Sequence, residues 1–223
     1  MEVKYNVELI SQLSLIMVIT SLIAAESRNL RYSAWAYTLQ ALLICGLLWA
    51  FSVGNPALKW WMVTALFTKA LITPYLLRHY IRQTGDEETQ AIIGFGPSVV
   101  AVTVVLGVFY WLFHRHAELL APTREASVEP FRTNLAVSLT VFVLGLYTIM
   151  SRRDAVKTVI GLCLLENAVH LSLVSLAPAT PETALFGIAS EVVITVFLLL
   201  YVITGIRQRF GSTDTFQLSE LHW

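Results

Sequence analysis

Charged side chains are scarce in this sequence of 223 residues. They make up 13% of the chain, about half of the roughly 25% that is typical of soluble domains. The 15 Lys and Arg only balance the 15 Asp and Glu, so the chain lacks the basic excess of a nucleic-acid-binding protein. The hydrophobic share of 56% excludes disorder and is larger than an ordinary soluble enzyme can bury. The composition therefore predicts a membrane protein.

Cysteines are few, and the common catalytic motifs are missing. Cys45 and Cys163 lie in separate apolar stretches, and we expect both to be buried, unpaired side chains. A disulfide and a two-thiol metal site are the alternatives. The chain has no cysteine cluster for iron–sulfur ligation, no glycine-rich phosphate loop and no nucleophile–base set in a soluble region. We therefore expect no active site on this chain.

The hydrophobic residues are gathered into long stretches, and a membrane-spanning helix needs about 20 mostly apolar residues. Seven segments qualify, of which the fifth is short: Val7–Ala25, Ala34–Val53, Pro56–Leu77, Ala91–Phe113, Leu135–Met150, Ala155–Ala177 and Ala184–Ile206. The sequence therefore predicts an all-α, polytopic membrane protein with about seven transmembrane helices. Gly211 is predicted to end the last helix.

The loops predict the orientation and the division of the chain. One side of the predicted membrane collects nine Lys and Arg and the other side five, and the positive-inside rule then places the N-terminus outside and the C-terminus in the cytoplasm. We predict a four-helix transmembrane region at residues 1–116, a polar loop at 117–133, and a three-helix region with a short cytoplasmic tail at 134–223.

Three ionisable side chains lie deep in the predicted helices: Lys69, Glu166 and Glu191. Charges nearer the helix ends, such as Lys59 and Lys157, are expected to extend to the membrane interface. An ionised group at depth costs at least about 2.5–3.5 kcal/mol, so the three deep groups need compensating partners. We interpret them as groups of a proton or ion pathway; the alternative is that they only pair and hold the bundle together.

His170, near Glu166, and Pro74, near Lys69, bear on the interpretation of the deep charges as a proton or ion pathway. His170 lies four residues after Glu166 and on the same helix face, where it would extend a proton path toward the outer surface. The alternative is a neutral histidine that hydrogen-bonds within the bundle. Pro74 follows Lys69 and leaves the carbonyl of Ala70 without its helical partner, so we expect an interrupted helix close to the lysine.

The last three spans resemble the NuoK-type subunit of respiratory complex I. That subunit has three helices, an arginine-bearing cytoplasmic loop after the first, and one intramembrane glutamate in each of the other two. The matching pieces here are Ser151-Arg152-Arg153-Asp154, Gly161-Leu-Cys-Leu-Leu-Glu166-Asn167, Ile188-Ala-Ser-Glu191 and the tail Arg209-Phe-Gly211-Ser-Thr-Asp214. They cover about 40% of the chain, from residue 134 to the end.

Across nearly the whole chain, the layout resembles hydrogenase-4 component E (HyfE-like), a membrane subunit of group 4 [NiFe]-hydrogenase and formate hydrogenlyase complexes. Four helices before the NuoK-like part, Thr68-Lys69 and Pro74 in the third span, and His170 after Glu166 carry this resemblance. It implies that Glu166 and Glu191 lie on the polar axis of a membrane arm.

The resemblance further implies a non-catalytic subunit of a complex-I-like oxidoreductase in a bacterial or archaeal cell (inner) membrane. Its partners would be antiporter-like and quinone-site-type membrane subunits and a peripheral redox arm that holds the Fe–S clusters and the Ni–Fe centre. We expect no cofactor or metal on this chain, contact with lipid, and no contact with nucleic acid. The predicted proton pathway consists of Glu166, Glu191, Lys69 and His170. The alternatives are a subunit of a multi-subunit cation/proton antiporter and a structural membrane anchor without ion conduction.

Overall fold

The computed structural model describes residues 5–84, 94–120, 123, 127–177 and 182–214, with the backbone alone for Thr84 and residues 182–190. These residues form helices and no strands. The helices are α1 (Val7–Glu26), α2 (Leu30–Phe51), α3 (Ala57–Ala65), the π-helix η1 (Leu66–Ile72), α4 (Thr73–Thr84), α5 (Phe95–Arg115), α6 (Ala117–Leu120), α7 (Phe131–Ser151), α8 (Ala155–Leu176) and α9 (Glu182–Phe210). The all-α prediction is confirmed.

Six of the described helices are long and apolar enough to cross a membrane, namely α1, α2, α5, α7, α8 and the part of α9 from Glu191 to Phe210. The third predicted span is also helical throughout, but it is divided into α3, η1 and α4, which follow one another without a gap. The interrupted helix that Pro74 predicts therefore takes the form of a π-helical segment ending two residues before the proline. Part of the predicted polar loop 117–133 is helical as α6, while residues 121, 122 and 124–126 lie outside the described residues.

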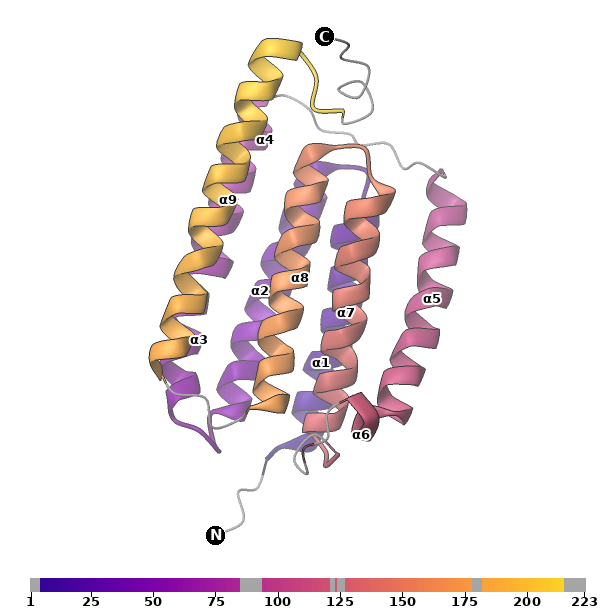
Figure 1. The fold of residues 1–223 in the computed structure, drawn as a ribbon, viewed down its shortest axis with the longest axis vertical. Coiled ribbons are helices and arrows are strands. Elements are labelled where there is room, and N and C mark those ends of the chain that lie inside the picture. Colours follow the sequence, from indigo (N-terminus) through magenta and orange to yellow (C-terminus); the bar gives the residue numbers. More distant parts are fainter. Residues whose placement is uncertain (1–4, 85–93, 121–122, 124–126, 178–181, 215–223) are drawn as a thin grey trace.

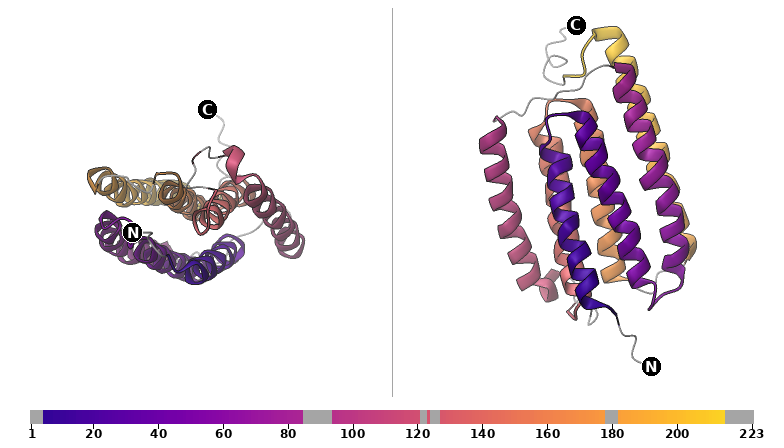
Figure 2. Two further views of the ribbon diagram at one scale, coloured as in Figure 1. Left: turned by 90° about the horizontal axis from the view of Figure 1, so that it is seen from below. Right: turned by 180° about the vertical axis from the view of Figure 1, so that it is seen from behind.

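Most of the helices lie in two layers (Figure 1). One layer contains α1, α2 and the continuous α3–η1–α4 segment, and the other contains α7, α8 and α9. Seen along the helix axes, the layers lie face to face, and α5 stands beside α7 at one edge (Figure 2). Each helix of the first layer packs on its counterpart in the second: α1 on α7, α2 on α8, and α3 and α4 on α9.

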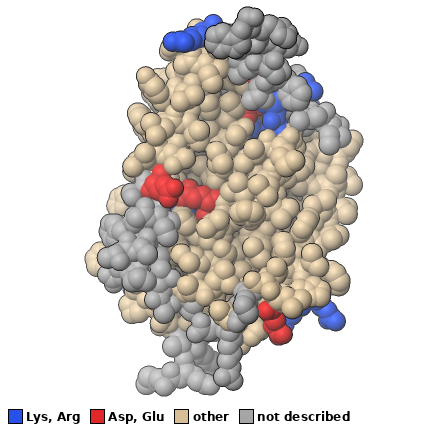
Figure 3. Space-filling view, viewed as in Figure 1, with Lys and Arg blue, Asp and Glu red and all other residues tan. Residues whose placement is uncertain are grey.

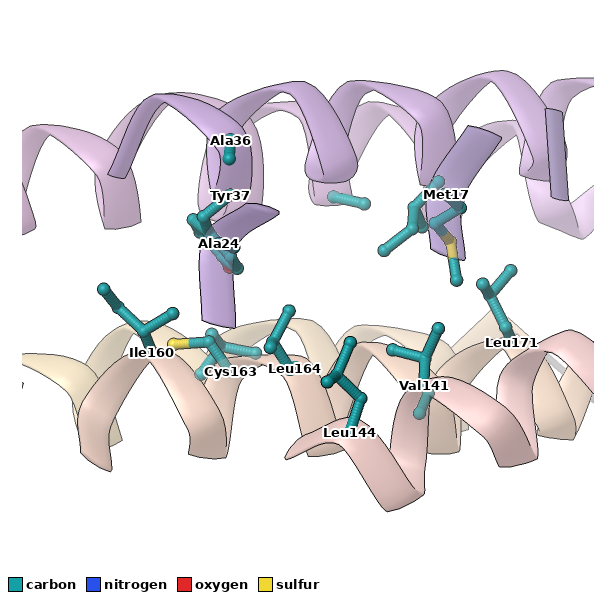
Figure 4. Packing of buried hydrophobic residues seen from close by; sticks show 14 of the residues in the cluster. Met17, Ala24, Ala36, Tyr37, Val141, Leu144, Ile160, Cys163, Leu164 and Leu171 are labelled. Atoms are coloured by element: carbon teal, nitrogen blue, oxygen red, sulfur yellow. The ribbon is translucent and has the colours of Figure 1, made fainter. Parts of the chain in front are cut away.

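Apolar side chains make up a large part of the interface between the layers. Figure 4 shows Met17 of α1 and Tyr37 of α2 pointing toward side chains of α7 and α8, among them Leu144 and Cys163. Both cysteines are free and buried, as predicted. Because lipid is as apolar as these side chains, association in the membrane depends on close van der Waals packing rather than on the hydrophobic effect.

Two glycines let α7 and α8 approach each other closely. A Cβ atom added at Gly145 would lie 2.9 Å from the backbone nitrogen of Leu165, and one at Gly161 would lie 3.1 Å from the carbonyl oxygen of Gly145. Such small residues at a crossing are typical of membrane helix pairs. This contact fixes the position of α8, the helix that carries Glu166.

Helix boundaries follow local signals. Asn29 and Asp154 are the N-caps of α2 and α8, and each side-chain oxygen accepts hydrogen bonds from the backbone N–H groups two and three residues later. Gly211 has a positive φ of 72° and directly follows α9, so the prediction that it ends the last helix is confirmed. The N-terminal end of α1 and the C-terminal end of α9 lie at opposite ends of the bundle (Figure 1).

Candidate functional site

Lys69 lies inside the bundle, near the middle of the α3–η1–α4 segment. Its side chain is 1% exposed, and it belongs to the π-helical turn, in which the N–H of Thr73 donates to the carbonyl of Thr68, five residues back. π-Helical turns widen a helix locally and occur frequently at functional sites. The turn therefore places a lysine toward the second layer without a break in the helix.

Three side chains of α8 meet the Lys69 ammonium group. Its Nζ atom lies 3.2 Å from Oε1 of Glu166, donates to Oδ1 of Asn167 at 2.8 Å, and contacts Nδ1 of His170. The amide oxygen of Asn167, the imidazole nitrogen of His170 and the carboxylate of Glu166 thus replace the water that a buried ammonium group loses. The compensating partner that the deep charge of Lys69 required is therefore present.

His170 connects the lysine to the carboxylate. A protonated Lys69 donates to Nδ1, so the ring proton of a neutral His170 resides on Nε2, which faces Oε1 of Glu166 at 3.6 Å. Trp61 packs edge-on against the imidazole with the ring centroids 5.5 Å apart. The histidine is buried between lysine, glutamate and tryptophan, and its orientation is fixed by all three.

A chain of buried amide and hydroxyl groups leads away from this cluster. Asn167 donates to Oε1 of Gln40 at 3.2 Å, and Gln40 donates to Oγ of Ser21 at 2.8 Å. All three side chains are fully buried, so the polar chain crosses from α8 through α2 to α1. Our sequence reasoning assigned none of them a role, although Gln40 is an amide in the middle of an apolar span and was a visible signal.

Glu166 and Glu191 line one groove between α8 and α9. The groove has a volume of about 450 Å³ and is lined by these two carboxylates, His170, Ser172, Thr195 and mainly aliphatic side chains. The Glu166 side chain is 28% exposed, and Glu191 is exposed. Figure 3 looks onto this layer and shows acidic side chains in the middle of a face that is otherwise largely uncharged. Glu166 therefore contacts Lys69 on one side and opens to the groove on the other.

A second buried charge cluster lies where α1 and α7 end. Nη2 of Arg152 is 2.6 Å from Oε2 of Glu26, and Oγ of Ser98 on α5 donates to Oε1 of the same glutamate at 3.1 Å. Glu26 and Arg152 are almost fully buried, with side-chain exposures of 5% and 0%. The cluster joins three helices, and the sequence analysis assigned neither residue a buried partner.

The expectation for Lys157 is wrong. Its side chain is fully buried, and Nζ donates to the carbonyls of Ala24 and Ala25 and to Oγ of Ser33. Those carbonyls belong to the last turn of α1, which has no helical partner for them and carries partial negative charge. The lysine therefore turns inward to cap α1 instead of extending to the interface.

The structure thus brings Lys69, Glu166 and His170 into direct contact and places Glu191 across the groove. Whether these groups carry protons stays a prediction. Asn167, Gln40 and Ser21 extend the buried polar cluster beyond the predicted residues.

Comparisons with known proteins agree with the resemblance seen in the sequence. Residues 133–223 match the family model described as NADH-ubiquinone/plastoquinone oxidoreductase chain 4L. Hydrogenase-4 component E of Escherichia coli (strain K12) is 28% identical over 215 residues, which cover 96% of this chain and 97% of that protein. The proteins of the same name from Escherichia coli O157:H7 and Shigella flexneri give the same values. No solved structure matches the chain. The predicted resemblance is therefore confirmed: this multi-pass membrane protein is similar to hydrogenase-4 component E along nearly its whole length, and its last three spanning helices lie in the part that matches the chain 4L family.

Proposed function

We propose that this chain is a membrane-arm subunit of a complex-I-like oxidoreductase of the group 4 [NiFe]-hydrogenase or formate hydrogenlyase type, located in a bacterial inner membrane. In this proposal Glu166, Glu191, Lys69 and His170 form part of a proton-translocation pathway. The Fe–S clusters and the Ni–Fe centre belong to partner subunits of a peripheral redox arm. The similarity to hydrogenase-4 component E and to the chain 4L family supports the assignment to such a complex.

The observation that carries the pathway is the cluster at Lys69. A lysine, a glutamate and a histidine touch one another well inside the helices that carry them, and the glutamate also opens to a groove that holds a second carboxylate. A purely structural ion pair needs no such opening. Ionisable groups within membrane helices face water-filled or protein-lined paths and often form proton relays.

The chemistry proceeds through changes in charge at Glu166. When Glu166 is ionised, it forms the ion pair with Lys69; when it takes up a proton, this attraction is lost and the Lys69 ammonium relies on Asn167 and His170 alone. Glu191 lines the same groove as Glu166. A proton that leaves Glu166 therefore has Glu191 as its next acceptor along the groove.

The test measures proton translocation separately from redox activity in the assembled complex. Glu166→Gln and Glu191→Gln keep the shape of the side chain but remove the titratable group. Each is expected to lower the rate of proton uptake into inverted membrane vesicles by about a hundredfold, the low end of what a positioned proton-transfer group contributes. Glu118→Gln on α6, an exposed carboxylate outside the spanning helices, serves as the control with normal translocation.

The outcomes separate the proposal from its alternatives. If both variants assemble and translocate protons at the normal rate, the pathway is refuted and the chain is a structural anchor. Iron and nickel that copurify with the chain support the oxidoreductase, whereas sodium-dependent exchange without these metals supports a cation/proton antiporter.

A further inference from the structure

The two layers have the same helix pattern at a constant spacing along the chain. α2 begins at Leu30 and α8 at Ala155, a difference of 125 residues, and α1 ends at Glu26 and α7 at Ser151, again 125 residues apart. The ends agree as well, because Phe51 and Leu176 close α2 and α8 at the same spacing. The first layer and the second layer thus have equivalent three-helix frameworks, which we call the first unit (residues 7–84) and the second unit (residues 131–210).

Local features repeat at the same spacing. The N-caps Asn29 and Asp154 are 125 residues apart and make the same pair of hydrogen bonds to the following turn. The tripeptide Ile-Arg-Gln occurs at residues 81–83, near the end of α4, and again at residues 206–208, near the end of α9. Both the backbone and these residues support an internal repeat of one three-helix unit.

The two units are stacked front to back. Tyr37, Lys69 and Leu77 of the first unit are buried against the second unit, whereas the residues 125 positions later, Leu162, Ile194 and Val202, are exposed. The reverse holds on the other side of each unit: Leu39 and Leu71 are exposed, but their equivalents Leu164 and Val196 are buried. The outward surface of the second unit is therefore equivalent to the surface of the first unit that is already covered.

We infer that this outward surface is the docking face for a membrane-spanning partner subunit that packs apolar helices on it and places a basic side chain opposite Glu191. We call this surface the front face and define it by six exposed apolar residues that are equivalent to buried residues of the first unit: Leu146, Leu162, Val169, Ile194, Leu198 and Val202.

The molecule itself shows how such a face is covered. The front of the first unit is covered by a three-helix layer, and at its centre Lys69 meets Glu166 of the covering layer. On the front face of the second unit, the central charge is a carboxylate, Glu191, which forms no ion pair with the described residues. Because an ionised carboxylate at this depth is costly without a partner, the covering layer has to supply the opposite sign.

A second copy of this chain does not meet that requirement. If a second copy continued the front-to-back stacking, the outer surface of its first unit would lie on the front face of this copy. The exposed residues in the centre of that outer surface are apolar, namely Ile19, Leu39, Phe67 and Leu71. No Lys or Arg lies at that depth among the described residues of this surface. Front-to-back contacts between identical copies also lead to open-ended stacks. The partner is therefore a different chain.

This inference concerns assembly and does not depend on proton transfer. It would stand if the glutamine variants at positions 166 and 191 translocated protons normally, and it can fail while the proton pathway holds.

The test uses a photo-reactive phenylalanine analogue, p-benzoylphenylalanine, incorporated at Val169, Ile194 or Leu198 of the full chain in native membranes that contain its complex. Val104 and Val108 on α5 are exposed to a similar degree and lie outside both units, so they are the matched control positions. We expect all three front-face positions to crosslink to spanning helices of one other chain. Peptide mapping should place a Lys or Arg of that chain within about one helical turn of the crosslinked residue, and the control positions should not give the same adduct.

A charge exchange completes the test. Glu191→Lys is expected to remove the partner from the purified complex, and the reciprocal Lys→Glu or Arg→Glu change in the partner is expected to restore it. Front-face crosslinks to lipid alone, to a second copy of this chain, or to a helix without a basic residue would overturn the inference. Because the crosslinking leaves Glu191 intact, it decides the question even where Glu191→Lys does not accumulate.

Discussion

Replacement of Arg152 by methionine should strongly destabilise the protein, because Arg152 is the only cation that touches the buried carboxylate of Glu26 among the described residues. Its Nη2 atom lies 2.6 Å from that carboxylate, both side chains are at most 5% exposed, and the same nitrogen also donates to the Glu26 carbonyl at 3.3 Å. In Arg152→Met the hydroxyl of Ser98 is the one hydrogen-bond donor that remains to the carboxylate among the residues that the structure describes. Removing one partner of a buried ion pair typically costs about 3–5 kcal/mol.

The double substitution Glu26→Gln with Arg152→Met distinguishes two effects: the loss of the ion pair itself, and the cost of a buried carboxylate left without a cation. Nε and Nη1 of Arg152 have no hydrogen-bond partner among the described residues, so the pair itself already carries a cost of desolvation. Replacing both charges by neutral groups is often close to neutral, and we expect the double variant to recover most of the stability that the single variant loses.

The assay is equilibrium unfolding in mixed detergent micelles with an increasing fraction of sodium dodecyl sulfate, followed by circular dichroism. Arg209→Met removes an exposed arginine near the end of α9 and should change the free energy of unfolding by no more than about 0.5 kcal/mol. If Arg152→Met were as mild as Arg209→Met, or if the double variant were as unstable as the single one, the argument from an unpaired buried carboxylate would be wrong.

Two further predictions concern the contact between α7 and α8 and the cap of α8. Gly145→Ala should lower the free energy of unfolding in the same assay by about 1–3 kcal/mol, because the added Cβ would lie 2.9 Å from the backbone nitrogen of Leu165. Gly205 has open space around its Cα, so the control variant Gly205→Ala should not destabilise the protein. Burial raises the pKa of the Asp154 carboxyl above its ordinary value despite the hydrogen bonds that it accepts. The folded state therefore binds this proton more tightly than the unfolded chain does. The resulting stabilisation of the fold is lost as the pH rises through the raised pKa. Asp154→Asn keeps the capping oxygen and should flatten this part of the dependence of melting temperature on pH; an unchanged profile would contradict the assignment to Asp154.

The spans and the deep charges were predictable because both depend on position along the chain. A stretch of about 20 apolar residues has one stable arrangement in a bilayer, and a lysine in the middle of it is unusual wherever the neighbouring helices lie. The depth of Lys69 and Glu166 thus followed from counting. Their contact did not, because it depends on how the two layers pack and on the π-helical turn that directs the lysine.

Charges near helix ends were harder to predict. The side chain of Lys157 is long enough either to reach the membrane surface or to turn inward, and the choice depends on the unpaired carbonyls of α1, more than 130 residues earlier in the chain. Glu26 and Arg152 present the same difficulty, since each looks like an ordinary loop charge until the two helix ends meet. The repeat of the three-helix unit was hidden because few identical residues mark it, although the Ile-Arg-Gln pair at residues 81–83 and 206–208 was a usable signal.

The single helix α5 has a consequence for how the chain is built. A unit of three crossings leaves the chain on the opposite side of the membrane from where it entered, so a second unit that started there would be inserted upside down. The one extra crossing by α5 returns the chain to the starting side, and the two units can then run in the same direction. This parity lets the two units pack as layers of the same direction, in which Lys69 faces Glu166. Loss of α5 would therefore invert one half of the protein and separate the two charges.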